Sequence, residues 1–208
     1  LSPFGWLYGV LTSARLGLYE KGVFESFDSG VPIVSVGNLT VGGTGKTPLV
    51  AFAARVLAGR GEKVCILTRG YRRENERERV LVSDGGRVLA DAAKAGDEPL
   101  ELARKLLGKS AVVADADRAG ASRWALEHLG ATAFVLDDGF QHLKIKRDLD
   151  VVCVDATNPF GNGKLLPAGI LREPLSSLKR AAATIVTRAN LVGEKQIARL
   201  KTEILKHN

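Results

Sequence analysis

The chain has 208 residues, of which 45% are hydrophobic and 25% charged, a balance that fits a folded domain with a real core and excludes a disordered chain. No apolar run reaches the ~20 residues that a membrane-spanning helix needs, and no cleavable signal pattern is visible. The formal net charge of +7 favours anionic partners, such as nucleic acid, acidic lipid or a phosphorylated substrate, without choosing among them.

Residues 1–30 predict an amphipathic helix followed by a lead-in to the main domain. Phe4, Leu7, Leu11 and Leu18 recur at helical spacing and share one face. Such a face suits a membrane-surface anchor, and it suits equally well a helix that packs on the domain's own core. The chain contains no methionine, so we expect the natural N-terminus to lie upstream.

From residue 31 to residue 208, short apolar segments alternate with helical segments. This alternation predicts one α/β domain, with a mostly parallel sheet flanked by helices, of the P-loop NTPase type. Cys65 and Cys153 lie in apolar runs and are expected to be buried thiols. The predicted strands cover 32–36, 64–67, 111–114, 133–136, 151–154 and 184–186, and the predicted helices cover 48–58, 118–129 and 194–206.

The segment GNLTVGGTGKT at 37–47 follows a predicted strand and precedes a predicted helix, as a phosphate-binding loop requires. Its glycines let backbone N–H groups turn inward around phosphate oxygens, while the lysine reaches the β- and γ-phosphates and the last threonine binds Mg²⁺. The usual first glycine is replaced by a threonine. The sequence therefore predicts that a nucleoside triphosphate binds to Thr40, Val41, Gly42, Gly43, Thr44, Gly45, Lys46 and Thr47.

A second candidate site follows the apolar strand at 133–136, which ends in Asp137 and Asp138. Carboxylates at this point can hold Mg²⁺ directly or through water. Two acids at a strand end are also common in plain turns, but the phosphate loop favours the metal interpretation.

A third motif is GDEP at 96–99. Pro99 suits the first turn of a helix, so Asp97 or Glu98 could simply cap that helix. Alternatively, a carboxylate held there can accept a proton from an attacking hydroxyl group.

A fourth motif places Arg172 and Glu173 in a segment interrupted by proline and glycine. Arg172 could meet phosphate charge and Glu173 could hold a metal, or the two could form a surface ion pair. The charge-dense segment 69–79, with five arginines against three glutamates, predicts an exposed loop.

Together these motifs resemble the tetraacyldisaccharide 4′-kinase family, the lipid A 4′-kinases of Gram-negative bacteria. Five motifs carry the resemblance, which extends from the N-terminal helix to about Asn190. In chain order they are SVGNLTVGGTGKT at 35–47, TRGYRR at 68–73, GDEP at 96–99, DDGFQH at 137–142, and LPAG at 166–169 with LREP at 171–174.

The resemblance implies transfer of the γ-phosphate of ATP, with Mg²⁺, to the 4′-hydroxyl of an acylated glucosamine disaccharide 1-phosphate. It implies that the partners are this lipid and a membrane surface, not nucleic acid, and that the protein is peripheral on the cytoplasmic face of the bacterial inner membrane. The implied roles are a base for Asp97, charge stabilisation for Lys46 and Arg172, and metal binding for Thr47, Asp137, Asp138 and Glu173.

Family members continue into a second, smaller domain that supplies a catalytic histidine, whereas this chain ends at Asn208. We therefore expect it to represent the first domain of a two-domain enzyme or a shortened form.

Two rival functions remain. The first is a P-loop GTPase or ATPase of the accessory or metallochaperone type. However, the segment TRAN at 187–190 has Asn190 where a guanine-binding motif would end in aspartate. The second rival is a non-catalytic module that binds lipid or nucleic acid through basic loops, which would leave Lys46, Thr47 and the paired aspartates unexplained.

Overall fold

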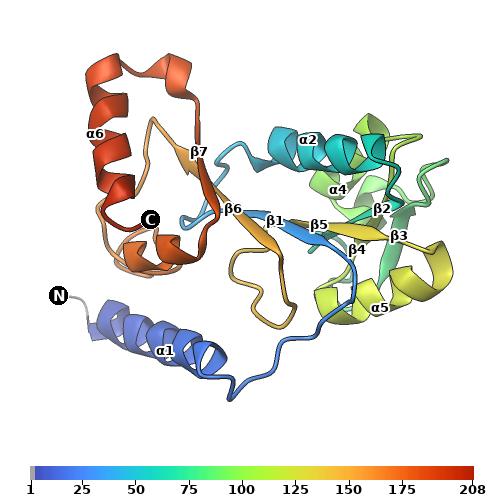
Figure 1. Cartoon of the computed structure of the whole chain (residues 1–208), viewed down its shortest axis with the longest axis horizontal. Helices are drawn as coiled ribbons and strands as arrows, with labels where there is room; N and C mark the ends of the chain where they lie inside the picture. Colours follow the sequence, from blue (N-terminus) through green and yellow to red (C-terminus); the bar gives the residue numbers. More distant parts are fainter. Residues whose placement is uncertain (1–2) are drawn as a thin grey trace. The chain divides into compact units, whose positions relative to one another are not determined.

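The computed structural model describes residues 3–208, so residues 1 and 2 of the predicted N-terminal segment lie outside the described part of the chain. Seven strands form one mostly parallel sheet in the order β3-β4-β2-β5-β1-β6-β7, which confirms the predicted α/β class (Figure 1). The strands are β1 (Ile33–Gly37), β2 (Val64–Thr68), β3 (Val80–Ser83), β4 (Ser110–Ala114), β5 (Ala133–Asp137), β6 (Leu149–Asp155) and β7 (Ala183–Thr187).

The helices agree with the predicted ones in place, and two short ones are added. They are α1 (Pro3–Glu20), α2 (Lys46–Gly59), α3 (Ala92–Ala95), α4 (Asp97–Lys105), α5 (Arg118–Leu129) and α6 (Glu194–Leu205), with 3₁₀ turns at η1 (Leu175–Arg180) and η2 (Ala189–Leu191). Because α2 begins at Lys46, the predicted phosphate loop runs directly into a helix N-terminus.

The described chain divides into two compact units. One contains Phe27–Val36 and Lys46–Leu149 and is called the central unit below. The other contains Gly37–Gly45, Asp150–Asn208 and the N-terminal segment through Ser26, and is called the terminal unit. The boundary expected after residue 30 stays a prediction.

In the central unit, helices cover both faces of the sheet. Figure 1 shows α2 and α4 on one side of β2, β4 and β5, and α5 on the other. The residues of β2, β4 and β5 are all buried, which explains why these strands read as continuous apolar runs rather than alternating ones. Cys65 and Cys153 are buried and form no disulfide, as expected of core thiols, and burial raises the pKa of Cys65 above its usual value.

Strand β3 is a difference from the prediction, which has no strand at 80–83. It pairs antiparallel with β4, with Leu81 opposite Val113. A four-residue apolar segment directly after a run of charged residues gives too short a signal to separate a strand from a loop.

In the terminal unit, β6 and β7 run parallel, with Val151 opposite Ala183. Helix α1 is held to the segment at 165–180: the hydroxyl of Tyr8 donates to the carbonyl of Arg172 at 3.0 Å, and Glu20 pairs with Lys179 at 3.0 Å. The helix nevertheless leaves much apolar surface in solvent.

The exposed side chains of α1 include three of the four that share the predicted face. Phe4, Trp6 and Leu11 are 72%, 66% and 62% exposed, and Leu7 is exposed as well. The described residues therefore support the surface interpretation of this face over burial in the core. No helix among residues 3–208 is both long enough and apolar enough to cross a membrane.

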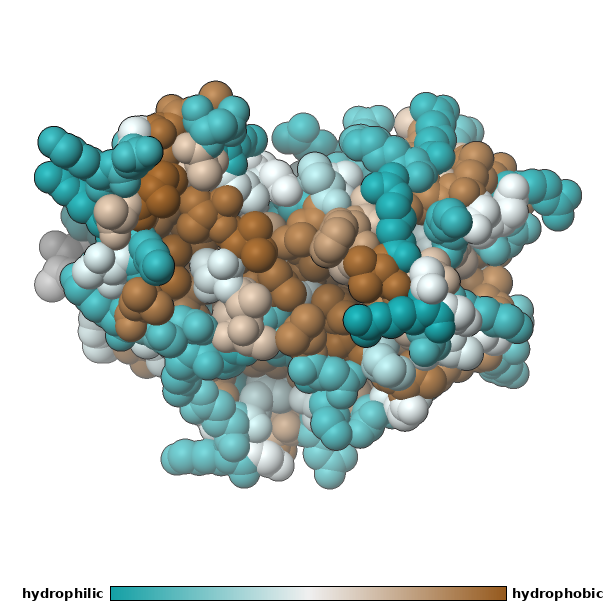
Figure 2. Space-filling model, turned by 45° about the horizontal axis from the view of Figure 1, so that its top comes forward, coloured by the Kyte–Doolittle hydropathy of each residue, from teal (hydrophilic) through white to brown (hydrophobic). Residues whose placement is uncertain are grey.

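Exposed apolar side chains are also found in the central unit, where Phe52 and Val56 of α2 are solvent-accessible. Figure 2, which brings the upper side of Figure 1 forward, shows hydrophobic surface in brown among hydrophilic side chains in teal.

Candidate functional site

In the central unit, Lys46 and Asp138 form an ion pair. Lys46 is the first residue of α2, and its Nζ lies 3.3 Å from Oδ1 of Asp138. Asp138 directly follows β5 and has a left-handed backbone, with φ 55°, a conformation that aspartate tolerates better than most residues. The structure thus brings together two residues that the sequence assigned to separate motifs.

Asp137, the last residue of β5, is only 6% exposed and accepts a hydrogen bond from the hydroxyl of Thr68 at 3.0 Å. Burial, followed by the neighbouring charge of Asp138, raises the pKa of Asp137 to about 6, while Lys46 and Thr68 oppose that rise. A cation close to both carboxylates would offset the repulsion between them and favour the ionised form of Asp137.

Two further groups interact with this pair: Arg118, which was not identified from the sequence, and Glu98 of the third motif. Arg118, the first residue of α5, is 6% exposed and donates to the carbonyl of Ala116 at 3.2 Å. Burial lowers the pKa of Arg118, while Asp137 and Asp138 act in the opposite direction. Glu98 raises the pKa of Asp137. Arg118 follows β4, and residues after parallel strands gather at one edge of the sheet, so this position carried a usable signal.

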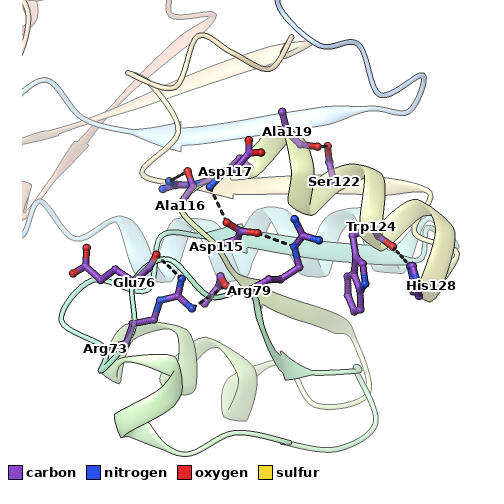
Figure 3. A network of polar contacts seen from close by, with 12 residues as sticks. Arg73, Glu76, Arg79, Asp115, Ala116, Asp117, Ala119, Ser122, Trp124 and His128 are labelled. Atoms are coloured by element: carbon purple, nitrogen blue, oxygen red, sulfur yellow. Dashed lines mark hydrogen bonds and ion pairs between the residues drawn. The ribbon is translucent and has the colours of Figure 1, made fainter.

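The segment at 69–79 is a loop in which most residues are exposed, as predicted, but Arg73 is buried. Figure 3 shows Arg73 turned toward the protein, where it donates to the carbonyls of Ala114 at 3.1 Å and Glu76 at 3.0 Å. Arg79 donates to Asp115 at 2.7 Å, and Asp115 also accepts the backbone N–H of Asp117 at 2.8 Å. These bonds tie the loop to the end of β4.

Asp97 lies in the first turn of α4 and is exposed. The cap position is Gly96, and no side chain caps this helix by a hydrogen bond, so the capping alternative is wrong. The carboxylate of Asp97 is therefore accessible to a substrate, as a base requires.

In the terminal unit, the first half of the phosphate loop is held by the fourth motif. The backbone N–H of Val41 donates to the carbonyl of Ile170 at 2.8 Å, and that of Arg172 donates to the carbonyl of Leu39 at 2.7 Å. Thr40 forms an isolated antiparallel bridge with Leu171 and is 4% exposed. An extended, buried position suits a β-branched residue, which explains why threonine replaces the usual glycine there.

The second half of this loop uses glycines for their backbone freedom. Gly42 and Gly45 have φ of 111° and 73°, values that other residues rarely adopt.

Glu173 is 1% exposed and pairs with Arg180, so the alternative of a surface ion pair with Arg172 is wrong. Arg180 balances the charge of this buried carboxylate, and carboxylate oxygens are ligands that Mg²⁺ accepts.

Among residues 3–208, the structure contains no group of three or more His, Cys, Asp or Glu side chains that could hold a metal ion. The predicted Mg²⁺ site does not need such a cluster, because its ligands would be a threonine hydroxyl, carboxylates and oxygens of the nucleotide. The pair Asp137 and Asp138 fits Mg²⁺, which prefers oxygen ligands and favours adjacent carboxylates that repel each other.

Comparisons with known proteins agree with the arrangement of these motifs. A family model described as tetraacyldisaccharide-1-P 4′-kinase matches residues 1–207. The tetraacyldisaccharide 4′-kinase of Geobacter metallireducens is 48% identical over 181 residues, which are 87% of this chain and 53% of the relative. That of Anaeromyxobacter sp. strain K is 50% identical over 187 residues, which are 90% and 49% of the two chains.

A crystal structure described as the apo form of LpxK from Aquifex aeolicus in complex with ATP superimposes with a TM-score of 0.82 at 41% identity. It covers 91% of this chain and 58% of the solved one. The chain thus spans about half the length of the curated relatives that it matches.

Proposed function

The chain belongs to the tetraacyldisaccharide-1-P 4′-kinase family, and from that membership we propose that it transfers the γ-phosphate of ATP to the 4′-hydroxyl of an acylated glucosamine disaccharide 1-phosphate, in lipid A biosynthesis. The hydroxyl oxygen forms the new bond to phosphorus, the bond to the β-phosphate oxygen breaks, and ADP leaves. The observation that carries the proposal is the phosphate loop that enters α2 at Lys46, with Lys46 paired to Asp138.

In this proposal, residues Thr40 to Thr47 bind the triphosphate. The glycines with positive φ let backbone N–H groups face phosphate oxygens, and the start of α2 adds its positive end. Lys46 then exchanges part of its contact with Asp138 for the β- and γ-phosphates. Arg172 neutralises charge that develops on the transferred group. The ATP in the Aquifex aeolicus structure supports the choice of nucleotide.

Thr47, Asp137, Asp138 and Glu173 are proposed to hold Mg²⁺, which when bound neutralises phosphate charge and orients the γ-phosphate. For binding, Asp137 must be ionised, and its pKa of about 6 leaves it ionised at neutral pH. The hydrogen bond from Thr68 occupies one oxygen of that carboxylate and leaves the other for the metal ion.

Asp97 is proposed as the base that accepts the proton of the 4′-hydroxyl. It is exposed, it does not cap its helix, and it lies in the same helical turn as Glu98, which acts electrostatically on Asp137.

A lipid acceptor must be met at a membrane, so we propose peripheral binding at the cytoplasmic face of the bacterial inner membrane. The exposed aromatic and aliphatic side chains of α1 support this, since such a surface partitions into the interface between water and lipid. The net charge of +7 adds attraction to anionic lipid.

The test is transfer of radiolabelled phosphate from [γ-³²P]ATP to the tetraacylated disaccharide 1-phosphate. It uses this chain alone and this chain joined to the remaining half of the Geobacter metallireducens relative. We expect labelled lipid from the joined protein and far less from these 208 residues alone, because phosphoryl transfer depends on closure of the site and alignment of the acceptor. Absence of labelled lipid from the joined protein, with Mg·ATP bound, would refute the proposed acceptor.

A further inference from the structure

Strand β7 ends in Thr187, whose side chain reaches the phosphate loop within the terminal unit. Its Oγ1 donates to the carbonyl oxygen of Thr44 at 2.8 Å, and the carbonyl of Val154 is a more distant second acceptor at 3.4 Å. Thr44 is 4% exposed, so this bond is shielded from water. A Cβ added to the next residue, Gly45, would lie 3.7 Å from the Cβ of Thr187, so Thr187 is also a neighbour of Gly45.

This bond fixes the direction of one peptide group. In a trans peptide the carbonyl of one residue and the N–H of the next point in opposite directions. With the carbonyl of Thr44 held toward Thr187, the N–H of Gly45 must point away from β7. Gly45 has φ of 73° and no side chain, so without the bond this peptide could rotate at little cost.

The backbone around Thr187 is itself held in place by hydrogen bonds and an ion pair. The carbonyl of Thr187 accepts the backbone N–H of Ala156 at 3.0 Å. The next residue, Arg188, has a left-handed backbone and pairs with Asp155, which also accepts the backbone N–H of Thr157 at 2.9 Å. These contacts fix the position of Thr187 at the end of β7, and with it the position of its hydroxyl group.

We propose that Thr187 is a positioning residue of the phosphate loop. Its hydroxyl holds the peptide between Thr44 and Gly45 in the orientation in which the Gly45 N–H donates to a phosphate oxygen of a nucleoside diphosphate or triphosphate. The inference rests on the proposed function only in assuming that this loop binds ATP. It explains the hydroxyl group at the end of β7, which has no role in the motifs that define the loop.

The test is calorimetric titration of the chain with Mg·ATP and with tripolyphosphate, which has phosphates but no base. Thr187→Val keeps the shape and removes the donor, and Thr187→Ser keeps the donor. The matched control is Thr184→Val on the same strand, because the hydroxyl of Thr184 is buried and makes no hydrogen bond among the described residues.

We expect Thr187→Val to bind both ligands about three- to tenfold more weakly, as loss of one buried hydrogen bond predicts. Thr187→Ser and Thr184→Val should bind like the unaltered chain. A loss for Mg·ATP but not for tripolyphosphate would place Thr187 at the base and overturn the inference.

Equal affinities of Thr187→Val and Thr184→Val, or a Thr187→Ser variant as weak as Thr187→Val, would also overturn it while leaving the proposed function intact. If the unaltered chain bound neither ligand, the proposed function would fail and this inference with it. Should Thr187→Val not fold, Thr187→Ala replaces it, with the same expected loss.

Discussion

Lys46 neutralises negative charge at the end of β5, and in the proposed function it also does so on the triphosphate. Replacing it by alanine removes a charged donor from the loop and leaves Asp138 without the ion pair measured at 3.3 Å. We expect Lys46→Ala to lower the affinity for Mg·ATP about 10- to 100-fold, the range for lost hydrogen bonds to charged groups. Calorimetry gives the affinity, and circular dichroism checks that the fold is intact.

The control for this variant is Arg55→Ala, which removes a cation from the exposed side of the same helix. Its affinity for Mg·ATP should stay unchanged. Equal affinities of Lys46→Ala and Arg55→Ala would show that the loop lysine has no role in binding.

Asp97→Asn tests the chemical step in the joined, full-length enzyme. The amide keeps the size of the side chain but cannot accept the proton, so turnover should fall by about 10²- to 10⁴-fold while the affinity for ATP is retained. Stability should fall only slightly, by about 0.3–1 kcal/mol, because a negative charge is lost from the first turn of α4 and no capping hydrogen bond is broken.

Glu101→Gln is the matched control, since it removes an exposed carboxylate from the same helix, where it pairs with Lys105. Normal turnover by Asp97→Asn, measured beside Glu101→Gln, would exclude Asp97 as the base.

At the residue scale, the sequence predicted the groups carried by local motifs and missed those set by strand order. Lys46 and Asp138 stand in recognisable patterns, so their type and place could be predicted. Thr68 donates to Asp137, and Asp137 raises the pKa of Arg118, because β2 and β4 end at the same edge of the sheet as β5. The sequence marks both residues as following strands, but it does not give the strand order that makes them neighbours of Asp137. The Arg180 partner of Glu173 lies in a 3₁₀ turn that no pattern predicted.

At the scale of elements, α1 is the helix whose role can be tested without disturbing the rest. Phe4 and Trp6 are the most exposed apolar side chains of the helix, while Tyr8 and Glu20 hold it to the terminal unit. The variant Phe4→Ser with Trp6→Ser therefore removes the exposed surface and keeps the attachment. We expect it to bind vesicles containing anionic lipid at least about tenfold more weakly than the unaltered chain, because two aromatic side chains no longer enter the interface.

Flotation with such vesicles measures this loss, and titration with Mg·ATP should show no change. Phe52→Ser on α2 is the control, since that side chain is 61% exposed but lies outside α1. If Phe52→Ser reduced flotation as much as the double variant, α1 would not be the membrane-binding element.

The burial of a strand decides whether it could be predicted from the sequence. The strands at the centre of the sheet are buried on both faces and form apolar runs between clear turn signals, so they were predicted within one or two residues. Strand β3 lies at the edge of the sheet, and its first two residues are only half-buried. The residues just before it, Arg73 and Arg79, bind the end of β4 through contacts between residues far apart in the sequence (Figure 3), and a local pattern does not show such contacts.

For the molecule as a whole, His142, which lies just after the paired aspartates, contributes to the pH dependence of folding. Burial, followed by the positive charge of Arg118, lowers the pKa of His142 from 6.5 to about 4; Arg147 and Lys144 act in the same direction, and Asp117 opposes them. Its Nε2 is buried and has no hydrogen-bond partner among the described residues, so no acceptor at this nitrogen stabilises the charged form.

Between pH 6.5 and about 4, the unfolded chain therefore binds a proton at this position that the folded chain does not. The contribution of His142 to the free energy of unfolding therefore falls as the pH falls through this window and is fully restored above pH 6.5. This loss is on the order of 2 kcal/mol at pH 4.5. Asp137, whose pKa is raised to about 6, acts in the opposite direction at these pH values.

His142→Gln removes this titration, so its free energy of unfolding should fall less between pH 7.5 and 4.5 than that of the unaltered chain, with a difference of about 2 kcal/mol. Urea denaturation at several pH values measures both slopes, and comparing the slopes cancels the carboxylates that titrate in both proteins. His128→Gln controls for loss of a histidine at an exposed position, where the ring stacks on Trp124 at 4.9 Å. Parallel pH profiles for His142→Gln and the unaltered chain would mean that His142 takes up its proton as readily in the folded chain as in the unfolded one, and that the cationic surroundings of Arg118 do not reach it.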